Sequence, residues 1–229
     1  MGLRRRWWMT FFGIPRGPLG RFGAWFMQRT NGTFYRAMAA ELDLQPEDEL
    51  LDVGCGSARL FADHARDVRY VAGLDASDVQ VAMARKRLAQ RIAAGTAEIV
   101  GGAAGELPWE DGRFSVATSV NALKFVPDPL AALREMHRVL RPGGRMAVTM
   151  GEAEEAPPDA TEGIVDVWGQ WQWTDAAARQ LVEEAGFADV EIRVLPVFSK
   201  ALLARGTKPA SGLADAPPEN ADPMAEPVA

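Results

Sequence analysis

The sequence predicts a doubly wound α/β fold with a mostly parallel β-sheet. From residue 49 onward, short apolar runs alternate with segments in which apolar residues recur every three or four positions. Such an alternation of strands and helices is typical of a parallel sheet covered by helices on both faces. The composition agrees, because 48% of the 229 residues are hydrophobic, which suits a substantial core.

Seven segments have the character of strands. The first of them, ELLDVG, is apolar on both faces, as in a strand buried inside a parallel sheet. The last two follow one another without a helix between them and predict a C-terminal antiparallel pair. The expected strands are residues 49–54, 70–77, 97–101, 113–120, 145–150, 190–195 and 197–204.

Capping residues indicate where the first two core helices begin. We expect Ser57 to open a helix at residues 57–66. Ser77 and Gln80 have the spacing of a capping box for the next helix. The apolar face expected for that helix consists of Val81, Ala84, Leu88 and Ile92.

The two later helices have clearer boundaries. Asp128 is placed to cap a helix with Pro129 at its first position, and that helix is expected to end at RPGG. Thr174 is expected to cap the last helix, and Gly186 to end it in the left-handed conformation.

The chain divides into three parts by composition. Residues 1–45 predict an N-terminal helical cap or arm, residues 46–205 the core, and residues 206–229 a tail that is rich in Ala, Pro, Asp and Glu and therefore expected to be disordered. Within the core, the acidic and Trp-rich residues 151–173 predict a loop.

Charge and cysteine content exclude several classes of protein. The net charge is −6, although residues 1–40 contain seven arginines and no acid, so the rest of the chain is strongly acidic. We therefore expect no nucleic-acid partner, whereas the basic arm could contact a membrane surface or pack on the acidic core. One cysteine, no signal peptide and no apolar run near ~18 residues favour a cytoplasmic protein. Two histidines without zinc-type spacing predict no metal site.

A glycine-lined turn follows the first strand. Gly54 and Gly56 allow the backbone to turn tightly and to approach a ligand closely. Asp75 lies nineteen residues after Gly56, at the end of the second strand, where a carboxylate can accept hydrogen bonds from both hydroxyls of a ribose. Since ligands of such sheets bind at the carboxyl ends of the strands, this combination indicates an adenosine-type nucleotide.

The details of the turn distinguish between such nucleotides. Dinucleotide sites use G-x-G-x-x-G, but the third glycine position is Arg59 here. Asp52 also precedes the turn, and a carboxylate suits a cationic amine better than a pyrophosphate. S-adenosylmethionine has such an amine together with a ribose.

The chain resembles the class I S-adenosylmethionine-dependent methyltransferases, in particular the broad group similar to ubiquinone and menaquinone biosynthesis methyltransferases. The resemblance covers roughly residues 15–205 and implies a seven-stranded Rossmann-like sheet. The motifs that carry it are LLDVGCGSARL, LDAS, ELPWEDGRFSVATSV and LREMHRVLRPGGRMAV.

The resemblance assigns roles to residues at four strand ends. It implies that Asp52, Gly54, Cys55 and Gly56 line the methionine portion of the cofactor, that Asp75 holds the ribose, that Ala76 and Ala103 lie at the adenine, and that Asn121 lies near the methionine. Three positions depart from the family pattern: Ala58 replaces a glycine, while Gly102 and Ser115 replace acids. The absence of an acid at Gly102 puts a carboxylate partner for the adenine amino group in doubt.

Candidate acceptor contacts are less well defined. The resemblance places an acceptor pocket near the Trp-rich loop and the fourth strand, which suggests Lys124, Trp168 and Trp171; Trp173 belongs to the same cluster. Tyr35, from the N-terminal helices, could close over the cofactor and is a further candidate contact. The tryptophans could equally form a local core, and Tyr35 and Lys124 could serve packing and solvation. His137 and His64 lie on helices and are expected to be structural, as is Cys55. No catalytic base is identified.

We therefore expect S-adenosylmethionine-dependent methyl transfer, by in-line displacement without a metal, to a small and possibly aromatic or lipophilic molecule. One alternative is a non-catalytic S-adenosylmethionine-binding partner or regulatory protein, which Gly102 and the missing base would suit. Another is a nicotinamide or flavin oxidoreductase, against which the missing third glycine argues.

Overall fold

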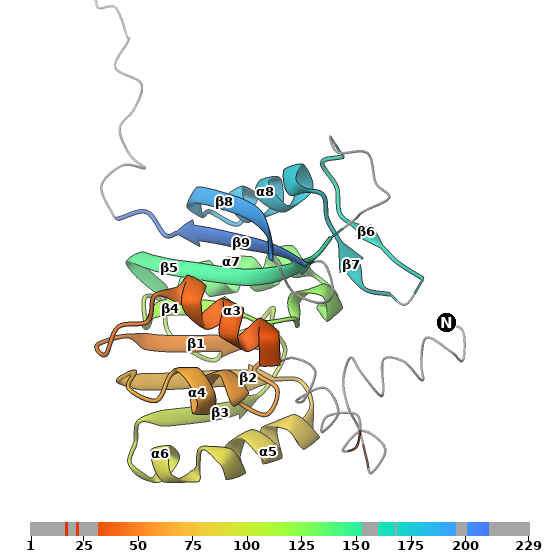
Figure 1. Cartoon of the computed structure of the whole chain (residues 1–229). Helices are drawn as coiled ribbons and strands as arrows, with labels where there is room; N and C mark the ends of the chain where they lie inside the picture. Colours follow the sequence, from red (N-terminus) through yellow and green to blue (C-terminus); the bar gives the residue numbers. More distant parts are fainter. Residues whose placement is uncertain are drawn as a thin grey trace, which may run out of the picture.

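A seven-stranded β-sheet forms the centre of the molecule (Figure 1). The structure is a computed structural model, and it describes residues 17, 22, 32–152, 160–167, 169–195 and 201–210. The strand order is β3-β2-β1-β4-β5-β9-β8. The strands are β1 (Glu49–Val53), β2 (Tyr70–Asp75), β3 (Ala97–Gly101), β4 (Phe114–Ser119), β5 (Leu140–Gly151), β8 (Ala188–Leu195) and β9 (Ala201–Thr207).

The directions of the strands confirm the predicted fold class. Strands β1 to β5 pair in parallel, and β9 pairs antiparallel with both β5 and β8. The chain reverses its strand order between β1 and β4, since β2 and β3 lie on one side of β1 and the later strands on the other. This reversal is the position at which open α/β sheets bind their ligands.

Helices cover both faces of the sheet (Figure 1). On one face, α3, α4 and α5 bury a cluster that includes Met38, Phe61 and Val81. On the other face, α7 and α8 bury a second cluster that includes Met136 and Val182. The helices are α3 (Gly32–Leu42), α4 (Arg59–His64), α5 (Asp78–Arg87), α6 (Ala89–Ala93), η2 (Leu123–Phe125), α7 (Pro129–Val139) and α8 (Asp175–Glu184).

Three predicted helix caps are confirmed. The side chains of Ser77, Asp128 and Thr174 accept hydrogen bonds from the backbone amides of Gln80, Ala131 and Ala177. Gly186 ends α8 with φ 99°.

The cap predicted at Ser57 is wrong. Helix α4 begins at Arg59 after Ala58, which has a left-handed backbone with φ 61° and provides no side-chain cap. Ser57 instead accepts a hydrogen bond on Oγ from Arg87. The expected apolar face also ends early, because α5 stops at Arg87 and Ile92 is 36% exposed on the separate helix α6.

Several segments extend beyond their predicted limits. Strand β5 begins at Leu140 rather than at Arg145 and so includes RPGG, while β9 runs to Thr207. Strand pairing explains both, since Arg145 aligns with Thr207 and the backbone amide of Lys208 bonds to Gly144. The three-part division of the chain otherwise remains a prediction, because residues 197–200, 211–229 and most of the N-terminal arm lie outside the described residues.

The predicted loop at residues 151–173 contains a small two-stranded ribbon. Strands β6 (Ile164–Val165) and β7 (Trp171–Gln172) pair antiparallel and project beyond the carboxyl end of β5 (Figure 1). Within the described residues, no helix is both long enough and apolar enough to cross a membrane.

Substituting Gly54 by alanine is expected to destabilise the protein by at least ~3 kcal/mol. Gly54 has φ +80°, and an added Cβ would overlap the Cβ of Ala122. Gly95→Ala is the matched control, because Gly95 has φ +70° but nothing within 4 Å of an added Cβ, so only backbone strain of ~1 kcal/mol applies. Urea unfolding of both variants measures the difference; equal losses would show that the contact with Ala122 does not matter.

Candidate functional site

The glycine turn joins the carboxyl ends of β1 and β2. The backbone amides of Gly54 and Cys55 both donate to the carbonyl of Leu74, at 2.7 and 3.0 Å. The turn is packed tightly beneath as well, since a Cβ on Gly73 would lie 2.7 Å from Sγ of Cys55. Burial raises the pKa of the Cys55 thiol well above its usual value, so this cysteine serves packing rather than nucleophilic chemistry.

Asp75 connects the turn to the following helix. Its Oδ2 accepts a hydrogen bond from the amide of Gly56 at 2.8 Å, and its Oδ1 accepts one from the amide of Ser77 at 2.9 Å. Burial raises the pKa of Asp75, and these two amides oppose the rise. The carboxylate is therefore fixed in place, and each oxygen still has a lone pair for a ligand.

Asp52 is a buried carboxylate without a partner. It is 1% exposed, and neither of its oxygens has a hydrogen-bond partner within the described structure. Burial, and secondarily the nearby charge of Asp75, raise the pKa of Asp52 from 3.8 to about 8. An unpartnered carboxylate in the interior is unfavourable unless a cation or a donor completes it, so this position points to a cationic ligand.

The ends of β3 and β4 complete the edge. Ala76 is exposed just beyond β2, and the amide of Gly102 donates to the carbonyl of Asp75 at 3.1 Å. The carbonyl of Ala103 accepts from the amide of Glu106. Asn121 has φ 55°, and its amide donates to Oγ1 of Thr149 at 2.5 Å, which ties the end of β4 to β5.

The structure thus brings nine predicted residues to one edge of the sheet. They come from four strand ends that lie next to one another in the order β3-β2-β1-β4. The residues are Asp52, Gly54, Cys55, Gly56, Asp75, Ala76, Gly102, Ala103 and Asn121.

The candidate acceptor residues have different surroundings. Tyr35 is only 8% exposed and belongs to the core beneath α3. Lys124 lies half-buried in η2 with Nζ 5.4 Å from the centroid of the Phe125 ring. Burial lowers the pKa of Lys124, and the nearby Asp166 opposes this effect.

The two described tryptophans of the predicted cluster, Trp171 and Trp173, differ in burial. The indole rings of Trp171 and Trp173 stack with centroids 6.0 Å apart. Trp173 is 2% exposed and belongs to the core, whereas Trp171 is half-buried at its margin. Trp168 lies outside the described residues. His137 packs in the core as expected, edge-on against Phe187 at 5.1 Å.

Two polar residues near this edge were not identified from the sequence. Gln80 is 6% exposed, and its Oε1 has no hydrogen-bond partner among the described residues, while its amide group lies beside Gly56. Glu152 immediately follows β5, and its Oε2 atom is likewise buried and unpartnered in that part of the chain. Gln80 fitted a capping box and was therefore interpreted as structural. Glu152 lies at the start of a loop without periodicity, which gives no signal for a site.

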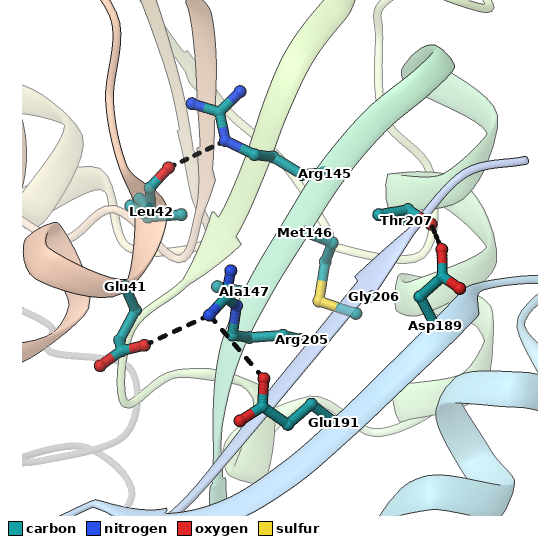
Figure 2. Close-up of a pocket in the computed structure, with 10 residues that line it drawn as sticks. All are labelled: Glu41, Leu42, Arg145, Met146, Ala147, Asp189, Glu191, Arg205, Gly206 and Thr207. Atoms are coloured by element: carbon teal, nitrogen blue, oxygen red, sulfur yellow. Dashed lines mark hydrogen bonds and ion pairs between the residues drawn. The ribbon is translucent and has the colours of Figure 1, made fainter. Parts of the chain in front are cut away.

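A cavity of about 170 Å³ lies elsewhere, at the opposite edge of the sheet (Figure 2). It lies between the end of α3, the start of the parallel part of β5 and the end of β9. The charged groups around it pair with one another or with neighbouring residues: Arg205 lies 3.8 Å from both Glu41 and Glu191, and Arg145 contacts Asp48 at 2.5 Å. This cavity is separate from the glycine turn.

Comparison with known proteins identifies the family. A family described as "Methyltransferase domain" matches residues 51–148. A demethylmenaquinone methyltransferase of Mycolicibacterium gilvum is 31% identical over 76% of this chain and 82% of that protein. The chain belongs to the S-adenosylmethionine-dependent methyltransferases.

One further sequence relative and one solved structure are similar to this chain. An uncharacterized 37.1 kDa protein in transposon TN4556 of Streptomyces fradiae is 37% identical over 53% of this chain, which spans only 35% of that protein. The fold matches that of the 1,6-didemethyltoxoflavin-N1-methyltransferase of Burkholderia thailandensis, solved with S-adenosylhomocysteine, with a TM-score of 0.65, 21% identity and coverage of 80% and 81% of the two chains.

The cofactor of the methyltransferase is S-adenosylmethionine, and the residues at the edge fit it. The orphaned carboxylate of Asp52 matches the cationic amine. Gly54 and Gly56 place no side chain at the turn, and Ala122 packs directly against Gly54.

Two of the three departures from the family pattern have a local explanation, whereas nothing in the structure explains Ala58, whose left-handed backbone suits a glycine better. Ser115 donates to Asp48 at 2.7 Å in a buried contact at the far edge, and a side chain at Gly102 would lie 3.0 Å from Leu74.

Proposed function

We propose that this methyltransferase acts on a small, flat, aromatic or lipophilic acceptor, and that the nine residues at the carboxyl edge hold its cofactor. The observation that carries the proposal is the unpartnered, buried carboxylate of Asp52 beside a glycine turn that Asp75 fixes. A buried anion of this kind suits the amine of the methionine portion.

Each part of the edge has a separate role in this proposal. Asp52 pairs with the amine, and the turn from Gly54 to Gly56 lies along the methionine portion. Asp75 accepts the two ribose hydroxyls with its remaining lone pairs. The exposed Ala76 and the backbone of Gly102 and Ala103 border the adenine, while Asn121 borders the methionine at the end of β4.

The bound cofactor supplies an electrophilic methyl group on a sulfonium. The chain itself orients the acceptor and excludes water around it. Positioning of this kind can contribute roughly 7–11 kcal/mol at best. The short η2 turn and the β6–β7 ribbon lie on the side of the edge where an acceptor would be held.

The acceptor class is supported by the side chains of Trp171 and Lys124 on this side, which form the proposed acceptor wall. The indole of Trp171 offers a flat apolar surface, and Lys124 offers a cation that can bind an acceptor oxygen. Two related proteins carry names that include flat ring systems, demethylmenaquinone and 1,6-didemethyltoxoflavin. Tyr35 packs in the core and stays a weaker candidate, and Trp168 stays a prediction.

Substituting Trp171 by alanine tests the acceptor class. We expect the KM for an aromatic probe such as 1-naphthol to rise about 10-fold, since aromatic stacking contributes about 0.5–1.5 kcal/mol beyond buried area. Calorimetric affinity for S-adenosylhomocysteine should not change. Trp109→Ala is the matched control, because Trp109 is a half-buried tryptophan that packs against Phe114 at the start of β4, and it should change neither value.

Two other outcomes would each contradict a different part of the proposal. Saturable cofactor binding without turnover of any aromatic probe would favour a non-catalytic cofactor-binding protein. Lost cofactor affinity in Trp171→Ala would assign this residue to the structure of the edge instead of the acceptor wall.

A further inference from the structure

Two carboxylates in the described structure have buried oxygens without a hydrogen-bond partner. One is Asp52 in β1, to which the proposed function assigns the cofactor amine. The other is Glu152, whose Oε2 atom is buried although the residue as a whole is half-buried. The remaining buried and unpartnered side-chain atoms in the described ranges belong to Gln80, Ser119 and His137. Glu152 therefore needs an explanation of its own.

Strand register places Glu152 on the acceptor side of the edge. Asp52 aligns with Thr118 of β4, and Thr118 aligns with Ala147 of β5. Glu152 follows Ala147 by five residues, which corresponds to about 16 Å along a strand toward the carboxyl edge. Glu152 thus lies farther toward the carboxyl edge than the glycine turn does. An acceptor bound over the cofactor would lie at this level.

The surroundings of Glu152 are those of the proposed acceptor wall. Glu152 forms a parallel bridge with Trp173, and the amide of Trp173 donates to the carbonyl of Gly151 at 2.8 Å. A Cβ on Gly151 would lie 2.6 Å from the carbonyl oxygen of Trp171, so β5 and β7 are in close contact just before Glu152. The η2 turn, which contains Lys124, contacts both strands.

The element that carries Lys124 and the strand that leads into Glu152 are therefore in contact. Lys124 is half-buried in η2, where burial lowers its pKa and the nearby charge of Asp166 on the ribbon opposes this effect. Glu152 has a buried oxygen that no described donor reaches. A buried carboxylate oxygen without a donor suits a group that has a proton to lose.

We propose that Glu152 is the general base that removes a proton from the acceptor. This inference rests on the proposed function. The carboxylate of Glu152 takes the proton from an O–H or N–H of the acceptor, and that oxygen or nitrogen forms a bond to the methyl carbon. The bond between this carbon and the cofactor sulfur breaks, its electron pair stays on sulfur, and Glu152 later releases the proton to water. Lys124 stabilises the developing negative charge. The acceptor is thus an aromatic molecule with an ionisable hydroxyl or amine.

The test uses Glu152→Gln in the full chain and three naphthalene probes. 1-Naphthol needs a base, 2,4-dinitro-1-naphthol ionises without one, and 1-methoxynaphthalene has no proton to lose. Turnover is followed by formation of S-adenosylhomocysteine, and binding of the first and third probes to the complex with S-adenosylhomocysteine is followed by tryptophan fluorescence. Glu162→Gln is the matched control, because Glu162 is exposed near the same ribbon.

We expect Glu152→Gln to lower kcat for 1-naphthol by about 10²–10⁴-fold, the usual contribution of a general base. The dinitro probe should lose less than about 5-fold, and calorimetric affinity for S-adenosylhomocysteine should be unchanged. The kcat of the wild type should rise with pH and then level off, and this rise should be absent from the variant. Glu152→Gln should bind 1-naphthol only slightly more tightly than 1-methoxynaphthalene, whereas the wild type should clearly prefer 1-naphthol.

If Glu152→Gln lowers kcat equally for 1-naphthol and for the dinitro probe, Glu152 is structural and not a base. If it lowers kcat for neither probe, the role as a base is likewise overturned. If the wild type binds and methylates 1-naphthol but Glu152→Gln behaves like Glu162→Gln, the inference fails and the proposed function stands. If the wild type binds S-adenosylhomocysteine but no naphthalene probe, the proposed acceptor class fails, and the inference fails with it.

Discussion

Substituting Asp75 by asparagine is expected to weaken binding of S-adenosylhomocysteine by at least ~100-fold. The wild-type carboxylate is held by the amides of Gly56 and Ser77, so it is already oriented when the ligand arrives. Each hydrogen bond from a ribose hydroxyl to a charged acceptor contributes about 1.5–3 kcal/mol. An amide can replace only one of the two oxygen acceptors. Isothermal titration calorimetry measures the change.

A matched variant and a modified ligand make this prediction specific. Asp67→Asn removes the same charge at an exposed position and should leave the affinity within about 2-fold. The 2′-deoxy analogue of S-adenosylhomocysteine should bind the wild type more weakly but should lose little further affinity in Asp75→Asn. Additive losses would show that Asp75 does not contact the ribose.

Substituting Asp52 by asparagine is expected to stabilise the protein without ligand at alkaline pH. Burial, followed by the charge of Asp75, raises the pKa of Asp52 to about 8 in the folded protein, compared with 3.8 for the exposed group. Between these two values the folded state binds more protons than the unfolded state, so stability falls as pH rises from about 4 to about 8. The amide of the Asp52→Asn variant does not titrate, so this fall is absent from the variant.

The size of the effect follows from the same shift. Near pH 4 the two proteins should differ by about 1 kcal/mol or less, and at pH 8.5 the variant should be more stable by roughly 5 kcal/mol. Urea unfolding across this pH range measures it. A difference in stability that does not change with pH would show that Asp52 is ionised in the ligand-free protein throughout the range.

Cofactor binding should show the opposite dependence on pH. A cationic amine binds the ionised form of Asp52, so affinity for S-adenosylhomocysteine should increase between pH 5.5 and 7, with release of a proton. Calorimetry in buffers of different ionisation enthalpy counts that proton. In Asp52→Asn the affinity should be lower at pH 7 and nearly independent of pH over this interval.

Local spacing was sufficient to predict that Asp52, the glycine turn and Asp75 lie at neighbouring strand ends, while the resemblance supplied the remaining candidate residues of this edge. Asp52, Gly54 and Asp75 lie at strand ends, and in a parallel sheet successive strand ends meet at one edge. Their meeting therefore needs only the correct assignment of strands. The helix caps at Asp128 and Thr174 were equally predictable, because each depends on residues within one turn.

Features that depend on distant partners were not predictable in this way. The start of β5 and the end of β9 are set by their pairing with each other. Glu152 follows a strand and precedes a segment without periodicity, and its pairing with Trp173 across the ribbon is invisible in the local sequence. Ser57 has the chemistry of a cap, but the left-handed backbone of Ala58 places it outside the helix.

The contact between Gly54 and Ala122 has a consequence for ligand binding by the enzyme. The cofactor turn and the segment that leads into η2 touch directly, without an intervening side chain on Gly54. In the proposed arrangement, the cofactor and the acceptor lie on the two sides of this contact and share it. By linkage, the factor by which the cofactor changes acceptor affinity equals the factor by which the acceptor changes cofactor affinity. Each ligand would therefore strengthen the binding of the other to the same extent, whichever of the two enters first.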